Sequence, residues 1–307
     1  MKEDDQKKEQ KLLTVVTPTF NRAKELGALY ESLRAQTFKD FCWIIIDDGS
    51  IDDTSEVVDS FKKDKNSFSI RYLKKKNGGK HTALNLAFKN VKTELLIIVD
   101  SDDYLVDEAV EIITEDWKKY GDERVCGLCY KRGRTDGSDL SDDFGKDVTI
   151  ANYRDFIINS RRKKDKAEVF RSSVFLDYTF PEFEGEKFLG EGFLWCKISH
   201  EYDMVFVNKI IYICEYLDGG LTKSGRRIRI ENPLGGMYYM SEFLNNRYRL
   251  RIRCEKALLY LTYARFAKKD VLGLFGKSDS KIILGINLLP SFILYKYWGR
   301  KYGASNG

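Results

Sequence analysis

Carboxylates gather after an apolar run at residues 94–99 (ELLIIV), where the chain continues Asp100-Ser101-Asp102-Asp103. Carboxylates this close together repel one another unless a cation compensates their charge. Their oxygens are hard ligands that suit Mg²⁺ or Mn²⁺, which proteins usually hold with one or two carboxylates and the phosphates of a substrate. The segment therefore predicts a divalent-metal site. A charged turn after a buried strand is the alternative interpretation.

Two further polar clusters have the composition of a nucleotide or phosphate site. Asp47-Asp48-Gly49-Ser50 follows the apolar run 41–46, although this sequence is also typical of a turn and a helix N-cap. Asn77-Gly78-Gly79-Lys80 places flexible backbone and a cation where we expect a helix to begin, which favours phosphate. Its spacing is not that of a Walker P-loop, and an ordinary loop is the alternative. For His81, which follows, a phosphate contact and a local structural role both stay open.

The elements that must position these clusters alternate between short apolar runs and helical patterns, which is typical of a βαβ arrangement with a mostly parallel sheet. We expect strands at 12–17, 41–46, 70–74 and 94–99, and helices at 22–36, 54–62 and 79–90, with Asn21 as an N-cap. Ligands of an open parallel sheet bind outside the carboxyl ends of its strands. The clusters at 18–22, 47–50, 77–80 and 100–103 should therefore meet at one edge.

The second part of the sequence is less regular. It predicts a strand at 125–130, a helix at 191–199, an apolar run at 204–216 that returns to the sheet, and a loop at 218–232. From Pro233 onward the pattern is helical and basic. We accordingly divide the chain into a polar tail (1–11), an α/β domain (12–225, with halves 12–110 and 111–225) and a basic helical C-terminal extension (226–307).

Composition argues against a nucleic-acid partner, because 52 basic and 47 acidic side chains give a net charge of only +5. Scattered cysteines and a polar segment 1–11 without a signal peptide lead us to expect a reducing, cytoplasmic setting. Cys126-x-x-Cys129 has no second ligand pair and is interpreted as core packing. The apolar run 282–295 is shorter than a membrane-spanning helix and is interrupted by Asn287 and Pro290. A helix lying on a membrane surface stays open.

Five segments in this order and spacing carry a resemblance: VVTPTFNR at 15–22, QTF at 36–38, IIIDDGS at 44–50, NGGK at 77–80 and VDSDD at 99–103. Together they resemble the family 2 inverting glycosyltransferases of GT-A fold, of the type that builds bacterial cell-surface polysaccharides. The resemblance is dense over 12–110 and continues more thinly to about 222, through GEGFLW at 190–195 and EYLDGGLT at 215–222. It implies a Rossmann-like, mostly parallel central sheet flanked by helices.

The resemblance also implies residue roles in donor binding. The segment after the first strand and the acidic pair after the second would cradle a nucleotide, usually uridine, which falls on Pro18, Phe20, Arg22 and Asp48, with Asp47 beside them. The family's Asp-x-Asp motif falls on Asp100 and Asp102. Asp102 would contact Mn²⁺ or Mg²⁺ directly, and Asp103 would reach toward the sugar. These roles describe a nucleotide-sugar donor, with a UDP-sugar favoured, held through its diphosphate and a divalent cation.

The family's catalytic base is a carboxylate in a Glu-Asp-like motif at the start of a later helix. Here that motif reads Glu191-Gly192, so the usual aspartate is missing and Glu191 is the candidate base, with Glu186 and Glu184 as alternatives. Such a base takes the proton of an acceptor hydroxyl that attacks the anomeric carbon from the opposite face. One displacement inverts the anomeric configuration, so an α-linked donor gives a β-linked product.

The basic C-terminal part suggests two further contacts. Arg226, Arg227 and Arg229 either close over the diphosphate or form a solvated basic loop. Farther on, cations beside Tyr and Trp suit a membrane interface, with a helical lid over the domain as the alternative. We expect a glycan or lipid-linked glycan acceptor and a cytoplasmic protein, peripheral on the inner face of the cell membrane. A non-catalytic sugar- or lipid-binding scaffold and a receiver-like phospho-acceptor domain are the rival functions.

Overall fold

The computed structural model describes residues 11–162, 164–214, 221–276 and 280–303. Within them a nine-stranded sheet has the order β3-β2-β1-β4-β8-β6-β9-β5, with β7 paired to β9. The strands are β1 (Leu13–Thr19), β2 (Phe41–Asp47), β3 (Ser69–Lys74), β4 (Leu95–Ile98), β5 (Tyr104–Leu105), β6 (Val125–Gly133), β7 (Val148–Ala151), β8 (Lys166–Arg171) and β9 (Asp203–Ile213). β1 to β4 are parallel, whereas β8 runs antiparallel to β4 and β6.

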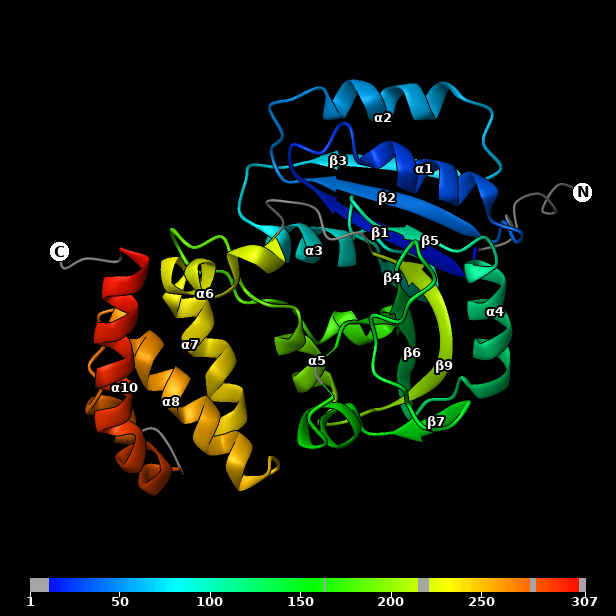
Figure 1. Cartoon of the computed structure of the whole chain (residues 1–307). Coiled ribbons are helices and arrows are strands. Elements are labelled where there is room, and N and C mark those ends of the chain that lie inside the picture. The colour runs from blue at the N-terminus through cyan, green and yellow to red at the C-terminus, as the bar shows by residue number, and fades with distance from the viewer. Residues whose placement is uncertain (1–10, 163, 215–220, 277–279, 304–307) are drawn as a thin grey trace, which may run out of the picture.

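Helices cover both faces of this sheet (Figure 1). On one face α1 (Leu26–Ala35), α2 (Thr54–Lys63) and α4 (Ala109–Tyr120) bury apolar side chains against β1 and β2 in one core. On the other face α3 (Lys80–Phe88) and α5 (Gly192–Ile198) close a second core, together with η1 (Arg154–Asn159) and η2 (Ser172–Leu176). Because β1 is buried along its whole length, both cores converge on the strand that ends at the predicted nucleotide segment.

The C-terminal helices form a unit of their own beside α5, shown in yellow to red in Figure 1. This helical unit comprises α6 (Leu221–Glu231), α7 (Pro233–Ser241), η3 (Glu242–Leu244), α8 (Leu250–Phe266), α9 (Gly273–Gly276) and α10 (Lys281–Tyr302). Its apolar side chains build a third core, to which α5 contributes Cys196. The helical C-terminal part is therefore confirmed, and it packs against the α/β domain through α5.

Two local predictions were wrong. Asn21 is not an N-cap: α1 begins at Leu26 after Glu25, and the Asn21 side chain instead accepts a hydrogen bond from the Ile51 backbone N–H at 2.9 Å. Most of the loop predicted at 218–232 is helix α6, which is broken at Gly225, where φ is 42°. The glycine interrupts the helical pattern in the sequence but only kinks the helix.

The apolar run 282–295, which we expected to be too short for a membrane span, lies inside the longer helix α10. Of the described helices, α10 is the one long and apolar enough to cross a membrane, with 22 residues and a mean hydropathy of 1.2 over an 18-residue stretch. The run had looked interrupted, but Asn287 turns its amide onto the Ile283 carbonyl at 2.9 Å and Pro290 is accommodated inside the helix. Length and composition alone are weak evidence for a span.

Candidate active site

The predicted nucleotide segment and the acidic motif meet at the carboxyl edge of the sheet. Pro18 is buried in β1, and beyond the strand Phe20 is 45% exposed. The Arg22 guanidinium lies 3.0 Å from Glu25 and 3.8 Å from Asp102, so it links the segment after β1 to the motif after β4. The parallel pairing of β1 with both neighbours produces this convergence.

Asp48 is used to hold the loop that leads into α3. One of its carboxylate oxygens accepts hydrogen bonds from Lys75 Nζ (2.8 Å) and the Gly78 N–H (2.9 Å). The other accepts from the Gly79 N–H (2.6 Å) and the Asn77 amide (3.1 Å). The N–H groups expected to bind phosphate therefore donate to Asp48 here, and a donor contact of Asn77, Gly78 and Gly79 stays a prediction.

Asp47 lies deeper and is fully buried. Its carboxylate accepts hydrogen bonds from the Ser50 backbone N–H at 2.7 Å and from the Tyr72 hydroxyl. These contacts fix the turn after β2, which in turn places Asp48. Asp47 therefore positions the turn, and its own contact with a nucleotide stays a prediction.

Gly79 explains how the loop reaches the rest of the site. Its φ of 92° is unfavourable for other residues, and a Cβ there would lie only 1.9 Å from the Lys187 carbonyl oxygen. The segment that precedes α5 can therefore pack directly on the start of α3. This close approach brings Lys80, the first residue of α3, to Glu191.

Lys80 is the centre of the site. Its ammonium contacts Asp100 and lies 2.7 Å from Glu191 Oε1. Burial alone would lower the pKa of Lys80, but the two carboxylates outweigh burial and raise it, so the ammonium stays charged. The same contact, with Arg132 and Arg22, overcomes burial and lowers the pKa of Asp100. The first residue of the acidic motif and the candidate base thus share one cation, although they are 91 positions apart in the sequence.

The other two aspartates of the motif differ from Asp100. Burial and the charge of Asp100 raise the pKa of Asp102, whose side chain is 24% exposed at the rim. Asp103 is 7% exposed and accepts a hydrogen bond from the Tyr212 hydroxyl at 2.8 Å. Burial and Asp100 raise the pKa of Asp103 to about 6. Asp103 therefore lies behind the motif, against β9, and its expected contact with the sugar stays a prediction.

The residues fit a divalent cation on one condition. Within the described ranges there is no group of three or more His, Cys, Asp or Glu side chains that could hold a metal ion. Asp100 and Asp102 would therefore need further oxygen ligands, which the phosphates of a donor can supply. The charge of Asp100 raises the pKa of Asp102, and a bound cation would compensate this negative charge.

Sequence reasoning missed the residues beneath the motif. Arg132 of β6 stacks over the Tyr212 ring at 4.1 Å and lies 4.0 Å from Asp103. The Tyr212 hydroxyl also accepts a hydrogen bond from the Asp100 backbone N–H at 3.0 Å. On β8, burial raises the pKa of Glu168 to about 7, and Glu191 contributes to that shift. The signal was a charged side chain within each of two strands, because charged side chains are rarely buried without a partner.

Several predicted residues are not brought to the acidic motif. Arg226 lies over the Trp298 ring at 5.4 Å, Arg227 pairs with Glu231 at 2.8 Å, and Arg229 lies over the Phe188 ring at 5.2 Å. All three contacts run within the helical unit or to the segment before α5. Closure of these arginines over a diphosphate therefore stays a prediction.

The alternative bases are placed elsewhere. Glu186 accepts hydrogen bonds from the backbone N–H groups of Leu234 (2.6 Å) and Gly235 (2.7 Å), at the start of α7. Glu184 is exposed to solvent. Of the three candidates, Glu191 is the one that shares Lys80 with the acidic motif.

Comparison with known proteins decides the family. Residues 14–176 match the model of "Glycosyl transferase family 2", which is more than half of the chain. The chain belongs to this family. It is 29% identical to the glycosyltransferase GlyG of Streptococcus pneumoniae over 73% of the chain and 75% of that relative. The resemblance stated from the sequence is therefore confirmed, and the chain is a glycosyltransferase. The family assignment also removes the receiver-like alternative.

Other relatives match over smaller shares of their length. A Campylobacter jejuni GalNAc(5)-diNAcBac-PP-undecaprenol beta-1,3-glucosyltransferase is 30% identical over 62% of the chain and 60% of that enzyme. An uncharacterized glycosyltransferase of Rickettsia felis is 42% identical, but the chain spans only 16% of it.

Solved structures show the same fold. Staphylococcus aureus TarS 1-349 with UDP-GlcNAc superimposes with a TM-score of 0.63 at 18% identity, over 91% of this chain and 79% of that one. A Pyrobaculum calidifontis mannosyltransferase in complex with GDP-Man and Mn²⁺ gives 0.57 at 14% identity, over 95% and 83%. The expected glycosyltransferase fold is confirmed.

Proposed function

We propose that this family 2 glycosyltransferase moves a sugar from a UDP-sugar to a hydroxyl group of a glycan or lipid-linked glycan, with inversion at the anomeric carbon. The observation that carries the proposal is the position of Lys80 between Asp100 and Glu191. The acidic motif and the candidate base thus contact one ammonium group, at the edge of the sheet where a donor would lie, and this supports both proposed roles.

The donor side is supported by the rim residues. Exposed Phe20 offers an apolar surface for a base, and Arg22 adds positive charge beside Asp102. Asp100 and Asp102 would hold Mn²⁺ or Mg²⁺ together with the donor diphosphate. When bound, the cation neutralises negative charge that develops on the leaving nucleotide. UDP-GlcNAc in the TarS structure favours uridine, and Mn²⁺ in the mannosyltransferase structure favours a divalent cation.

On the acceptor side we assign the proton transfer to Glu191. Its carboxylate takes the proton of the acceptor hydroxyl while that oxygen forms a bond to the anomeric carbon. The bond from the anomeric carbon to the diphosphate breaks in the same step, and UDP leaves with the bonding electrons. The lysine contact holds the carboxylate at the rim, where its side chain is 26% exposed. The beta linkage named for the Campylobacter relative is the product expected from an α-linked donor.

The experiment is a nucleotide-release assay with UDP-, GDP- and CDP-sugars, each in Mn²⁺, in Mg²⁺ and in EDTA. We expect release from a UDP-sugar that requires one of the two cations and vanishes in EDTA. Full release in EDTA would contradict the metal role, and release from a GDP- or CDP-sugar alone would contradict the choice of donor. Binding of UDP-sugars without turnover, with water or with acceptor glycans, would favour the non-catalytic scaffold.

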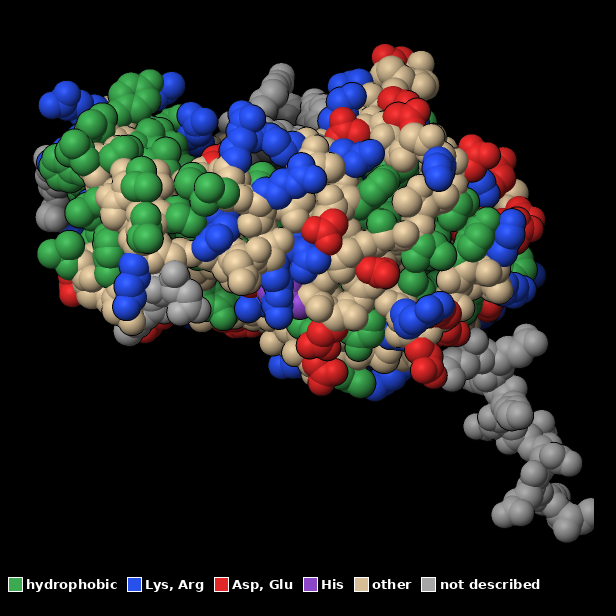
Figure 2. All heavy atoms as spheres, turned by 90° about the horizontal axis from the view of Figure 1, so that it is seen from below, with side chains coloured by type: hydrophobic (Ala, Val, Ile, Leu, Met, Phe, Trp, Pro, Cys, Tyr) green, Lys and Arg blue, Asp and Glu red, His purple; other side chains and the backbone are tan. Residues whose placement is uncertain are grey.

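A separate observation supports contact with a membrane. The outward face of α10 carries apolar side chains that are 54% to 80% exposed: Ile282, Ile286, Leu289, Ile293 and Tyr297. Their spacing puts them on one side of the helix, while the opposite side packs on α8. Figure 2 shows hydrophobic side chains gathered over the helical unit, with Lys and Arg around them.

The charges of α10 fit an anionic surface, because the helix contains Lys281, Lys296, Arg300 and Lys301 and no acidic residue. The other side of α10 contacts α8, where Arg265 donates a hydrogen bond to the Leu288 carbonyl at 3.1 Å. We therefore assign α10 to the plane of a membrane surface, where it would bring the enzyme to lipid-linked acceptors on the inner face of the cell membrane.

A further inference from the structure

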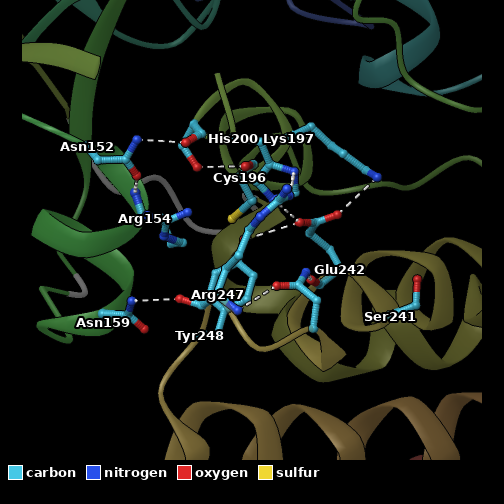
Figure 3. A network of polar contacts seen from close by, with 12 residues as sticks. Asn152, Arg154, Asn159, Cys196, Lys197, His200, Ser241, Glu242, Arg247 and Tyr248 are labelled. Atoms are coloured by element: carbon cyan, nitrogen blue, oxygen red, sulfur yellow. Dashed lines mark hydrogen bonds and ion pairs between the residues drawn. The ribbon is translucent and has the colours of Figure 1, made fainter. Parts of the chain in front are cut away.

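The helical unit contacts α5 at both of its ends, and α5 begins directly after Glu191. At the C-terminal end the contact is a charged cluster around Glu242 of η3 (Figure 3). The Glu242 carboxylate is 5% exposed and lies 2.7 Å from His200 Nε2 and 3.1 Å from Lys197 Nζ. Arg247 in turn lies 2.8 Å from the other ring nitrogen of His200.

At the N-terminal end the contact is steric. The Tyr239 side chain of α7 lies over the segment Gly190-Glu191-Gly192, and a Cβ at position 192 would be only 2.3 Å from its hydroxyl oxygen. Atoms that are not bonded do not approach so closely. A Cβ at position 190 would meet the edge of the same ring at 3.4 Å, which is an ordinary contact. Position 192 thus has no room for a side chain while the Tyr239 hydroxyl is present.

Backbone conformation does not explain the glycine at 192. It is the first residue of helix α5 and has no positive φ, so any residue is allowed there by its dihedral angles. Alanine would even favour the helix over glycine. The observation that accounts for Gly192 is the hydroxyl that occupies its side-chain space.

Tyr239 is itself firmly held. Its ring packs against Phe193 of α5 at 6.2 Å and Phe243 of η3 at 5.4 Å, and it borders both the second and the third core. Burial raises the pKa of the Tyr239 hydroxyl, so the group is neutral and cannot replace the missing carboxylate as a base. Its effect on the site must therefore come through the backbone that it contacts.

We propose that Tyr239 is a positioning residue for Glu191: the helical unit fixes the start of α5 through Tyr239 and its end through Glu242, and thereby sets the direction in which Glu191 points. The inference rests on the proposed role of Glu191 as the base. Because Tyr239 belongs to α7, this proposal makes the helical unit a part of the catalytic site.

The test uses Gly192→Ala in the full chain. The new methyl group collides with the Tyr239 hydroxyl and displaces the start of α5, so kcat for UDP release should fall about 10- to 100-fold. The KM for the donor should change little, because the donor contacts lie on other elements, and thermal unfolding shows whether the variant is folded. Gly190→Ala is the matched control on the same segment and should keep the wild-type kcat.

The second variant is a rescue. Tyr239→Phe removes the hydroxyl, after which the nearest ring atom lies 3.3 Å from a Cβ at position 192. Gly192→Ala combined with Tyr239→Phe should therefore recover the kcat of Tyr239→Phe alone. Wild-type kcat in Gly192→Ala, or no recovery in the double variant, would overturn the inference. Undiminished UDP release by Glu191→Gln would instead overturn the proposed base, which separates the two failures.

Discussion

The rim formed by β1 to β4 and the region formed by α5 with the helical unit both contribute to the site, but in different ways. The rim supplies Arg22, Asp48, Lys80 and Asp100 from short segments that each follow one strand. The α5 region supplies Glu191, whose surroundings come from residues up to about 50 positions later. Side chains at the rim contact each other directly, whereas α5 is held mainly by packing and by Glu242.

This difference has a chemical meaning. A nucleotide diphosphate and its cation demand fixed oxygen and nitrogen positions, and strand ends in a buried sheet provide them. An acceptor differs from one enzyme to the next, and helices packed on one another can change their side chains without disturbing the sheet. We therefore expect variants at the rim to remove donor chemistry, and variants around α5 to affect turnover with the donor still bound.

The largest effect should come from the metal motif. Asp102→Asn removes a charged oxygen ligand, so UDP release should fall by about 10²–10³-fold, because a metal ion supplies several kcal/mol of charge stabilisation in the transition state. Asp59→Asn, on the surface of α2, is the control for loss of a carboxylate. Equal UDP release by wild type and Asp102→Asn, measured at saturating Mn²⁺, would show that the rim does not act through this residue.

Lys80 joins the two regions, and its loss should weaken both. Lys80→Met leaves Asp100 and Glu191 without their shared cation. Charged hydrogen bonds contribute about 1.5–3 kcal/mol, so we expect roughly a 10- to 100-fold loss of UDP release. Lys80→Arg should retain more activity than Lys80→Met. If the two variants behave alike and resemble wild type, the ammonium group does not organise the site.

The rim was easier to predict from the sequence than the region around α5. Strands and their polar ends were predictable, because residues such as Asp47, Asp48 and Asp100 follow uninterrupted apolar runs. Asn21 was predicted to be an N-cap from its residue type alone. In the structure its side-chain oxygen instead accepts a hydrogen bond from the backbone N–H of Ile51, in the loop after β2. Helix α6 was not predicted, because the helical pattern in the sequence is interrupted at Gly225, where the helix is kinked.

Contacts between distant elements left no local signal. The residues around Gly192 do not indicate that Tyr239 lies over it. The residues around Asp103 do not indicate its hydrogen bond with Tyr212. Such pairs depend on how α7 packs on α5 and how β9 returns beside the motif, and packing of this kind is set by the shape of whole elements. The sequence showed that the usual aspartate is missing at position 192. Only the structure showed that the Tyr239 hydroxyl occupies the space of a side chain there.

A smaller effect is expected at the far end of α5. Burial alone would raise the pKa of Glu242, but His200 and Lys197 lower it below its ordinary value. Its ionised form therefore stabilises the fold above the unfolded pKa of about 4.3, and this contribution is lost as pH falls through the lower folded value. Glu242→Gln should cost about 1–3 kcal/mol at pH 7 and much less at pH 3. Thermal unfolding at both pH values measures the difference; an equal loss at pH 3 would exclude a charge effect.

The smallest effect on turnover should come from α10. Ile286→Glu with Ile293→Glu puts charge on the exposed apolar face, so the protein should no longer sediment with phosphatidylglycerol vesicles, while UDP release in solution stays at the wild-type level. Ile150→Glu, at an exposed position on β7, is the control. High salt should release the wild-type protein in part, because the attraction of cations to the lipid is screened. Unchanged sedimentation of the double variant would contradict the membrane assignment.

The most direct test of the account measures UDP-sugar affinity and UDP release on Glu191→Gln. A general base usually contributes about 10²–10⁴-fold, and the glutamine keeps the size of the side chain next to Lys80. The account predicts that release falls by that factor while affinity for the donor and Mn²⁺ stays close to wild type. Release near the wild-type rate would contradict it and would remove Glu191 from the mechanism.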